Sequence, residues 1–176
     1  MRDVNATSLD APPALRARPA FAEVAAEHLD AVYRYIVFLT GDRAAAEDLT
    51  AETFEKAFRS WRRFDPRRGA PRTWLCSIAR TVAVDWFRAE TRRRRREDAY
   101  AREHPTEQFG DGLPGPVEAA LRALAPGERE VIALRILLDL DGPSAARVLG
   151  ISQTACSTRL SRALKRLEEM TNDVDG

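Results

Sequence analysis

The sequence predicts an all-α protein built from two small helical domains that a flexible linker joins. Apolar residues recur at three- and four-residue spacing in both halves of the chain, which is typical of helices with one buried face. Glycine and proline interrupt this pattern between the two halves, as expected of a linker. A length of 176 residues suits two small domains, and the content of Ala, Arg, Leu and Glu favours helix.

The expected boundaries divide the chain into five segments. They are a disordered lead-in at 1–20, a first domain at 21–96, a linker at 97–116, a second domain at 117–170 and a tail at 171–176. The lead-in lacks the apolar stretch of a secretory signal. No apolar run approaches the ~18 residues of a membrane span, so we expect a cytoplasmic protein without a span of its own. Cys76 and Cys156 are expected to be buried and reduced, with a redox switch as the alternative.

Three helices are predicted in the first domain. The first covers 21–40 and ends at Gly41, and the second has Asp42 as its N-cap and runs to about Trp61. A loop over 63–71, with two prolines and a glycine, precedes a third helix that ends in five consecutive arginines. The residues expected to face the core are Phe21, Val24, Ala25, Leu29, Val32, Tyr33, Ile36 and Val37, then Leu49, Phe54, Ala57, Phe58 and Trp61, then Trp74, Leu75, Ile78, Ala79, Val82, Ala83, Trp86 and Phe87.

The second domain is predicted to hold a helix-turn-helix motif. Asp141 caps a short helix, Gly150 turns the chain, and Ser152 caps a longer helix that runs to about residue 170. The expected helices in chain order are 117–124, one that Pro126 opens, 144–149 and 153–170. The residues expected to face the core are Val131, Ile132, Leu134, Ile136 and Leu137, then Ala155, Cys156, Leu160, Ala163, Leu164 and Leu167.

The last helix has a polar and basic outer face that suits DNA. The second helix of such a motif lies in the major groove, where its side chains reach base edges and phosphates. The outward residues are Gln153, Thr154, Ser157, Thr158, Arg159, Arg162 and Lys165. An ordinary helical hairpin with a solvated basic face is the alternative.

The net charge of +1 conceals a strong segregation of charge along the chain. Residues 59–96 hold 13 arginines against three carboxylates, which indicates contact with a polyanion. Arginines surround the 63–71 loop and continue along the third helix; they are Arg62, Arg63, Arg67, Arg68, Arg72, Arg80, Arg88 and Arg92–Arg96. Aromatic residues are interleaved with them, and core packing is the preferred interpretation for most of these. The alternative for the arginines is a solubilising face.

The second helix carries the opposite charge. Asp48, Glu52 and Glu55 stack on one side at helical spacing. Carboxylates do not sit against phosphates, so this face indicates a basic protein partner beside the DNA surface. On the charge pattern alone, a solvated acidic face is the preferred interpretation.

Enzymatic chemistry has little support in this sequence. The histidines are His28 and His104, and the chain has no glycine-rich phosphate loop, no H-x-x-x-H pattern and no nucleophile elbow. We therefore expect a non-catalytic protein with no cofactor and no metal site.

Three motifs make the chain resemble the extracytoplasmic-function (ECF, group IV) sigma factors of the sigma-70 family. They are T-G-D-x-x-x-A-E-D-L at 40–49, F-D-P-R-R-G at 64–69 and L-x-x-L-x-P-x-E-R-E-V at 121–131. The first domain resembles region 2 of that family and the second domain resembles region 4. Together the similar stretches cover roughly residues 21–96 and 117–168.

The resemblance implies a sigma factor that binds core RNA polymerase and directs promoter recognition and transcription initiation. The helix with Asp48, Leu49, Glu52 and Glu55 would dock on the clamp helices of the largest polymerase subunit, and the second domain would meet the flap region of the second-largest. An anti-sigma factor is a further implied partner. The residues implied at the −10 element are Arg62, Arg63, Phe64, Asp65, Arg67, Arg68, Arg72, Trp74, Arg80 and Arg88. Those implied at the −35 element are Ser152, Gln153, Thr154, Ser157, Thr158, Arg159, Arg162 and Lys165.

Two other functions fit parts of the pattern. A stand-alone helix-turn-helix regulator with a partner-binding first domain would bind its DNA without polymerase. A nucleic-acid enzyme, such as a small recombinase, would need a nucleophile and carboxylates in a cleft, and the sequence places none convincingly. Ala51, Thr81, Ala145 and Ser157 depart from residues frequent in the resembled family, so no promoter sequence is carried over.

Overall fold

The computed structural model describes residues 20–101, 120–121 and 123–172, without the side chains of 97–101 and 172. Every regular element in these ranges is helical, which confirms the predicted all-α class. The helices are α1 (Phe21–Thr40), α2 (Arg43–Ser60), α3 (Pro71–Ala101), α5 (Pro126–Ile132), α6 (Gly142–Leu149) and α7 (Gln153–Asn172), with a 3-10 turn η1 (Trp61–Arg63) and a π-helical turn η2 (Ala133–Leu137). Within the same ranges, no helix has the length and apolar character to cross a membrane.

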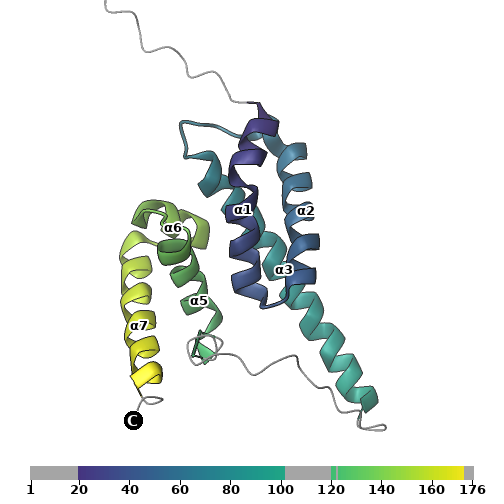
Figure 1. Cartoon of the computed structure of the whole chain (residues 1–176), viewed down its shortest axis with the longest axis vertical. Helices are drawn as coiled ribbons and strands as arrows, with labels where there is room; N and C mark the ends of the chain where they lie inside the picture. Colours follow the sequence, from purple (N-terminus) through teal and green to yellow (C-terminus); the bar gives the residue numbers. More distant parts are fainter. Residues whose placement is uncertain (1–19, 102–119, 122, 173–176) are drawn as a thin grey trace, which may run out of the picture.

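The first domain is an α1–α2 hairpin packed on α3 (Figure 1). Gly41 ends α1 with a φ of 67°, a left-handed conformation that suits glycine. The Asp42 carboxylate then accepts a hydrogen bond from the Ala45 N–H at 3.0 Å and begins α2. Both predicted helix ends are therefore confirmed.

The third helix is longer than expected. It continues to Ala101, five residues beyond the arginine run at which we predicted its end. The rest of the expected linker, at 102–116, lies outside the described residues, as do most of the lead-in and part of the tail. The helix predicted at 117–124 is described only in part, and Ala120, Leu121 and Ala123 in it are helical.

The second domain contains the predicted helix-turn-helix as α6 and α7. The Asp141 carboxylate accepts from the Ser144 N–H at 2.7 Å, and the Ser152 hydroxyl accepts from the Ala155 N–H at 3.1 Å. Between these two caps, Gly150 turns the chain with a φ of 67°. The helix α6 begins at Gly142, two residues earlier than predicted.

Most residues predicted for the core are at least partly buried, but several are not. The exposed ones are Leu29, Phe58, Phe87, Ile136, Leu137, Ala155 and Leu164. In α2 the buried stripe contains the predicted Leu49 and Ala57, and it also contains Ala46, Thr50 and Thr53. The hydroxyls of the two threonines donate to carbonyls four residues earlier in the helix. Phe58 lies off this stripe and is 66% exposed.

The π-helical turn explains the errors at Ile136 and Leu137. The Leu138 N–H donates to the Ala133 carbonyl at 2.9 Å, five residues back, so this turn holds more residues than an α-helical turn. The predicted helical period no longer applies there. As a result, Ala133 and Leu138 are buried while Ile136 and Leu137 are exposed.

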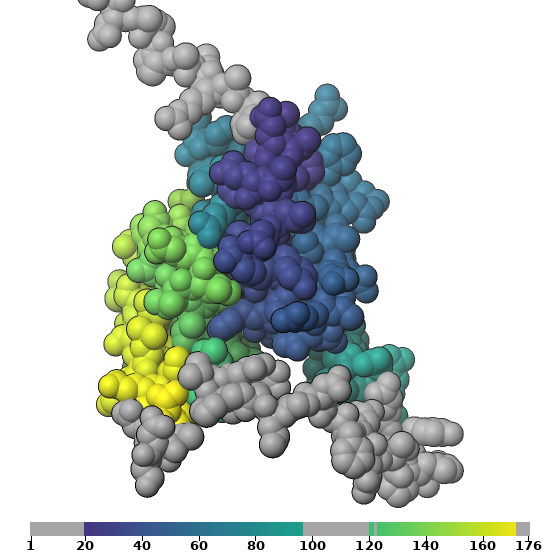
Figure 2. Space-filling model, in the orientation of Figure 1, coloured from purple at the N-terminus to yellow at the C-terminus, as the bar shows by residue number. Residues whose placement is uncertain are grey.

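The two domains pack directly against each other. Helix α3 contacts α6, and α1 contacts both α5 and η2. Figure 2 shows the surfaces of the two domains meeting along the middle of the molecule, and one continuous core cluster includes residues of both. Helix α7 lies on the side of the second domain away from α1 and α2 (Figure 1).

Candidate nucleic-acid and partner interfaces

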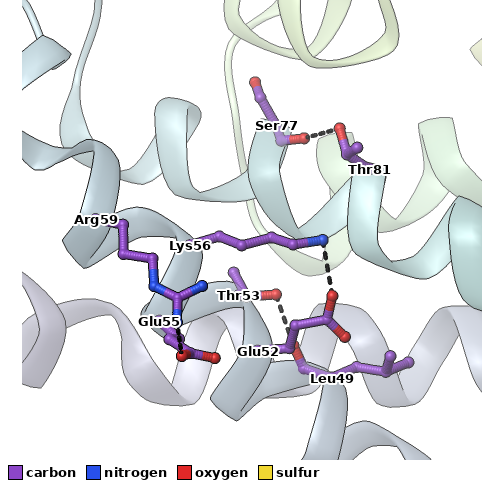
Figure 3. A network of polar contacts seen from close by, with 8 residues as sticks. All are labelled: Leu49, Glu52, Thr53, Glu55, Lys56, Arg59, Ser77 and Thr81. Carbon is purple, nitrogen blue, oxygen red and sulfur yellow. Dashed lines mark hydrogen bonds and ion pairs between the residues drawn. The ribbon is translucent and has the colours of Figure 1, made fainter.

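The acidic face of α2 is on the surface. Asp48, Glu52 and Glu55 are all exposed, as the helical spacing predicts. Figure 3 shows Glu52 bound to Lys56, with 2.7 Å between Oε1 and Nζ, and Glu55 bound to Arg59. Because these cations come from the same helix and are themselves exposed, a basic partner can displace them at little cost.

Leu49 does not belong to this acidic surface. Its side chain is only 5% exposed and is part of the core cluster. Contact of Leu49 with a partner stays a prediction, and in this structure its side chain packs in the core. The residue holds α2 against the rest of the first domain.

The loop between η1 and α3 is held by its own aspartate. The Asp65 carboxylate accepts from the Arg67 N–H at 2.9 Å, and the Asp65 carbonyl accepts from the Arg68 N–H at 3.0 Å. These bonds form a tight turn that displays both arginine side chains to solvent. Arg62 and Arg63 are exposed just before the turn. Asp65 therefore shapes the loop, while the four arginines supply its positive charge.

Phe64 is a core residue in this structure. It is 3% exposed and stacks on Trp61, with ring centroids 4.8 Å apart and 7° between the planes. Trp74 is half-buried beside it, with ring centroids 5.3 Å apart. Contact of Phe64 with DNA stays a prediction; in this structure Phe64 is buried, whereas Trp74 is only half-buried.

Arg72 is half-buried, and its guanidinium influences residues of the first domain. Burial lowers the pKa of His28, the Glu27 carboxylate opposes this, and the Arg72 guanidinium adds to the lowering. Burial raises the pKa of the Cys76 thiol to about 12, against the effect of Arg72. The Nε of Arg72 is buried without a hydrogen-bond partner among the described residues. Only part of this side chain is therefore accessible to DNA.

The cations of α3 differ in accessibility. Arg88 is exposed and lies 3.6 Å from the Asp85 carboxylate. Arg93 and Arg94 both contact the Glu90 carboxylate at 2.9 Å, and their hydrogen bonds lower the pKa of Glu90. Arg80 instead contacts Glu130 of the second domain.

The outer face of α7 is open to solvent. Gln153, Thr154, Ser157, Thr158, Arg162 and Lys165 are exposed on it, as predicted. Arg159 is half-buried, and a Cβ built on Gly127 would lie 3.2 Å from its guanidinium Nη1. Arg159 must therefore leave α5 to reach a base or phosphate in the groove. Ser152 acts through its hydroxyl as the cap of α7.

Two charged residues with interdomain roles were missed by the sequence analysis. Glu130 lies beside Val131 and Ile132 in a mostly buried stretch of α5, and Arg147 lies on α6 against the loop at Gly69. The apolar run that directly follows Glu130, at 131–134, was the only sequence signal for its burial. Among the described residues, no group of three His, Cys, Asp or Glu side chains gathers as metal ligands would.

Family models match both halves of the chain. Sigma-70 region 2 matches residues 24–93, and Sigma-70 region 4 matches residues 115–167. The first match contains the acidic α2 and the basic start of α3, and the second contains the helix-turn-helix. The fold and these two regions define a sigma factor of the sigma-70 type.

Relatives of the chain carry the same description. The ECF RNA polymerase sigma factor SigC of Mycobacterium tuberculosis is 35% identical over 136 residues, which are 75% of this chain and 72% of SigC. BldN, an ECF RNA polymerase sigma factor of Streptomyces coelicolor, is 34% identical over 161 residues, which are 88% of this chain. The chain spans 61% of the length of BldN. The chain belongs to the ECF RNA polymerase sigma factors.

A solved structure shows the same arrangement of helices. The sigma factor RpoE of Bartonella quintana, in complex with the anti-sigma factor NepR, is 26% identical with a TM-score of 0.68. The similarity covers 86% of this chain and 96% of RpoE, so it includes both domains.

Proposed function

We propose that this chain binds core RNA polymerase and directs it to promoters through the −10 and −35 elements. The observation that carries this proposal is the presence of three separate charged surfaces on a chain with both sigma regions. They are the acidic face of α2, the basic loop and α3, and the polar and basic face of α7. The protein contributes binding, and the polymerase contributes the catalysis.

The acidic face of α2 is proposed to bind the polymerase. Asp48, Glu52 and Glu55 lie on the side of the first domain that the second domain leaves uncovered. A basic partner fits this face by charge, and the clamp helices of the largest subunit are the proposed partner. The second domain is proposed to meet the flap region of the second-largest subunit.

The basic loop and α3 are proposed to contact the −10 element. The exposed side chains of Arg62, Arg63, Arg67 and Arg68 bring positive charge to one loop, and Arg88 extends it along α3. Such cations track phosphates without reading sequence. Trp74 offers a partly exposed indole for stacking with an unpaired base.

The face of α7 is proposed to read the −35 element. Gln153 and Thr154 lie at the start of the helix, where a recognition helix contacts base edges. Arg162 and Lys165 lie two to three turns further on and are placed for phosphate contacts. Both side chains are exposed.

An anti-sigma factor is a proposed regulator of this chain. Support comes from the Bartonella quintana complex, in which a sigma factor of similar whole-chain structure binds an anti-sigma factor. Co-purification of the full chain with a candidate anti-sigma factor from the same genome tests this interaction.

Run-off transcription tests the proposed function. Core RNA polymerase is incubated with and without the full chain on a pool of genomic promoter fragments, and the transcripts are sequenced. We expect new transcripts whose upstream sequences share elements near −35 and −10. Absence of core binding, with specific DNA binding by the chain alone, would refute this function and favour the stand-alone regulator.

A further inference from the structure

One ion pair joins the two domains across their contact. The guanidinium of Arg80, on α3, forms a salt bridge with the carboxylate of Glu130, on α5, and one of its nitrogens donates a hydrogen bond to that carboxylate. Nη2 donates to Oε2 at 3.2 Å, whereas Nε lies 3.2 Å from Oε1 without a hydrogen bond to it or to another described residue. The side chain of Glu130 is 12% exposed and that of Arg80 is 32% exposed, so water screens this pair less than the surface pairs of α2.

The same contact covers the loop that precedes α3. A Cβ built on Gly69 would lie 2.6 Å from Nη1 of Arg147, so the guanidinium of Arg147 rests directly on the Gly69 backbone. Helix α6, which carries Arg147, also packs along α3. Two surfaces of the first domain, the Gly69 region of the loop and the Arg80 side chain, are therefore occupied by the second domain.

The contact leaves other functional surfaces open. Asp48, Glu52 and Glu55 on α2 are exposed, and so are Gln153 and Arg162 on α7. The closed arrangement therefore covers part of the proposed −10 surface and leaves the proposed polymerase and −35 surfaces accessible.

The interface also contains a feature that favours its opening. The phenol of Tyr35 is fully buried, and its oxygen has no hydrogen-bond partner among the described residues. A buried hydroxyl without a partner costs free energy that hydration recovers when the surface opens. Burial raises the pKa of Tyr35, and the negative charge of the Glu130 carboxylate raises it further.

We propose that Arg80 and Glu130 form an intramolecular latch that masks the −10 surface of the free chain. The Glu130 carboxylate pairs with the guanidinium that would otherwise bind a DNA phosphate, because both anions compete for the same positive charge. Opening the domains frees Arg80 and uncovers the loop at Gly69. The latch rests on the proposed function only for the statement that Arg80 meets DNA, since the ion pair itself is a property of the closed chain.

Small-angle scattering of the full chain tests the latch without DNA. The substitution Glu130→Arg places two guanidinium groups face to face, and we expect a larger radius of gyration than for the wild type. The double variant Arg80→Glu, Glu130→Arg restores opposite charges and should return the compact profile. The matched control Glu168→Arg makes the same charge change on the exposed side of α7 and should leave the profile unchanged. Superimposable profiles for Glu130→Arg and the wild type would overturn the proposal.

Binding of a labelled oligothymidine by fluorescence anisotropy tests the masking. Glu130→Gln keeps the shape of the side chain and removes its charge, and we expect oligothymidine to bind about tenfold more tightly, or about 1.4 kcal/mol. Glu128→Gln is the matched control, because Glu128 lies on the same helix and pairs with Arg166 within the second domain. Equal tightening by both variants overturns the latch, and this comparison decides the matter if Glu130→Arg fails to fold.

The two proposals fail in different experiments. Opening of the chain by Glu130→Arg, without run-off transcripts, would support the latch and refute the sigma function. Transcripts with a Glu130→Arg profile identical to that of the wild type would support the sigma function and refute the latch.

Discussion

Phe64 stacks on Trp61 with 4.8 Å between the ring centroids, and this pair joins the end of α2 to the start of the arginine-rich loop. Trp74 closes the cluster from α3, at 5.3 Å from Phe64 and 5.6 Å from Trp61. The loop therefore has a rigid aromatic base beneath its exposed cations. Because this base holds the loop backbone in place, less backbone freedom is lost when the loop binds a nucleic acid, which lowers the entropic cost of binding.

The substitution Phe64→Ala should destabilise the first domain by about 3–5 kcal/mol, because it removes a buried ring and leaves a cavity. Urea unfolding followed by tryptophan fluorescence measures this change. Phe58→Ala is the control, since Phe58 is 66% exposed, and it should change the free energy of unfolding by about 0.5 kcal/mol or less. Equal losses in the two variants would contradict the assignment of Phe64 to the core.

The pair of substitutions Asp48→Arg and Glu52→Arg should abolish binding to core polymerase. They reverse the charge of the surface proposed to meet a basic partner, and both side chains are exposed, so the fold should persist. Co-elution with core polymerase measures the binding. The control is Glu168→Arg with Glu169→Arg, which makes the same charge change on α7. Retained binding by the α2 variant would locate the polymerase surface elsewhere.

The substitution Asp141→Ala should destabilise the helix-turn-helix near neutral pH. The Ser144 hydroxyl and the Ser144 N–H donate to the Asp141 carboxylate, and these bonds hold its pKa below the usual range. A lowered folded-state pKa means that the contribution is complete above the ordinary aspartate pKa and is lost as pH falls through the lowered value. The difference in thermal midpoint between wild type and variant should therefore shrink at acid pH. A difference that stays constant with pH would show that the charge of Asp141 does not matter.

The substitution Gly150→Ala should destabilise the second domain by about 1 kcal/mol, because an L side chain is strained at this left-handed φ of 67°. A Cβ at Gly150 meets nothing within 4 Å, so the cost comes from the backbone alone. Gly150→Asn is the comparison, since asparagine tolerates this conformation better than alanine, and thermal unfolding measures both. Equal midpoints for wild type and Gly150→Ala would contradict the backbone argument.

Sequence patterns located the helices better than they located their buried faces. Leu29, Phe58 and Ile136 were predicted to face the core, yet all three are exposed. A helical period identifies an apolar side but does not say how wide a strip the neighbouring helices cover. The π-helical turn at 133–137 changed the period itself, and nothing in the local sequence indicated it.

The surface residues were predicted with similar unevenness. Asp48 and Arg162 are exposed where charge patterns placed them, because a charged side chain rarely enters a core without a partner. Leu49 and Phe64 came from motif positions and proved to be buried. Arg80 was expected to face DNA and instead contacts Glu130 in the closed chain.

The sequence alone determined the helices, their caps at Asp42, Asp141 and Ser152, the turns at Gly41 and Gly150, and the separation of acidic and basic surfaces. These features depend on the chemistry of neighbouring residues, so a short stretch of chain is sufficient to specify them. The tertiary structure alone decided that the two domains pack together and that Arg80 meets a carboxylate 50 residues away. Such a contact depends on how whole helix faces fit together. Local sequence patterns carry no information about the distance in space between two residues that are far apart along the chain.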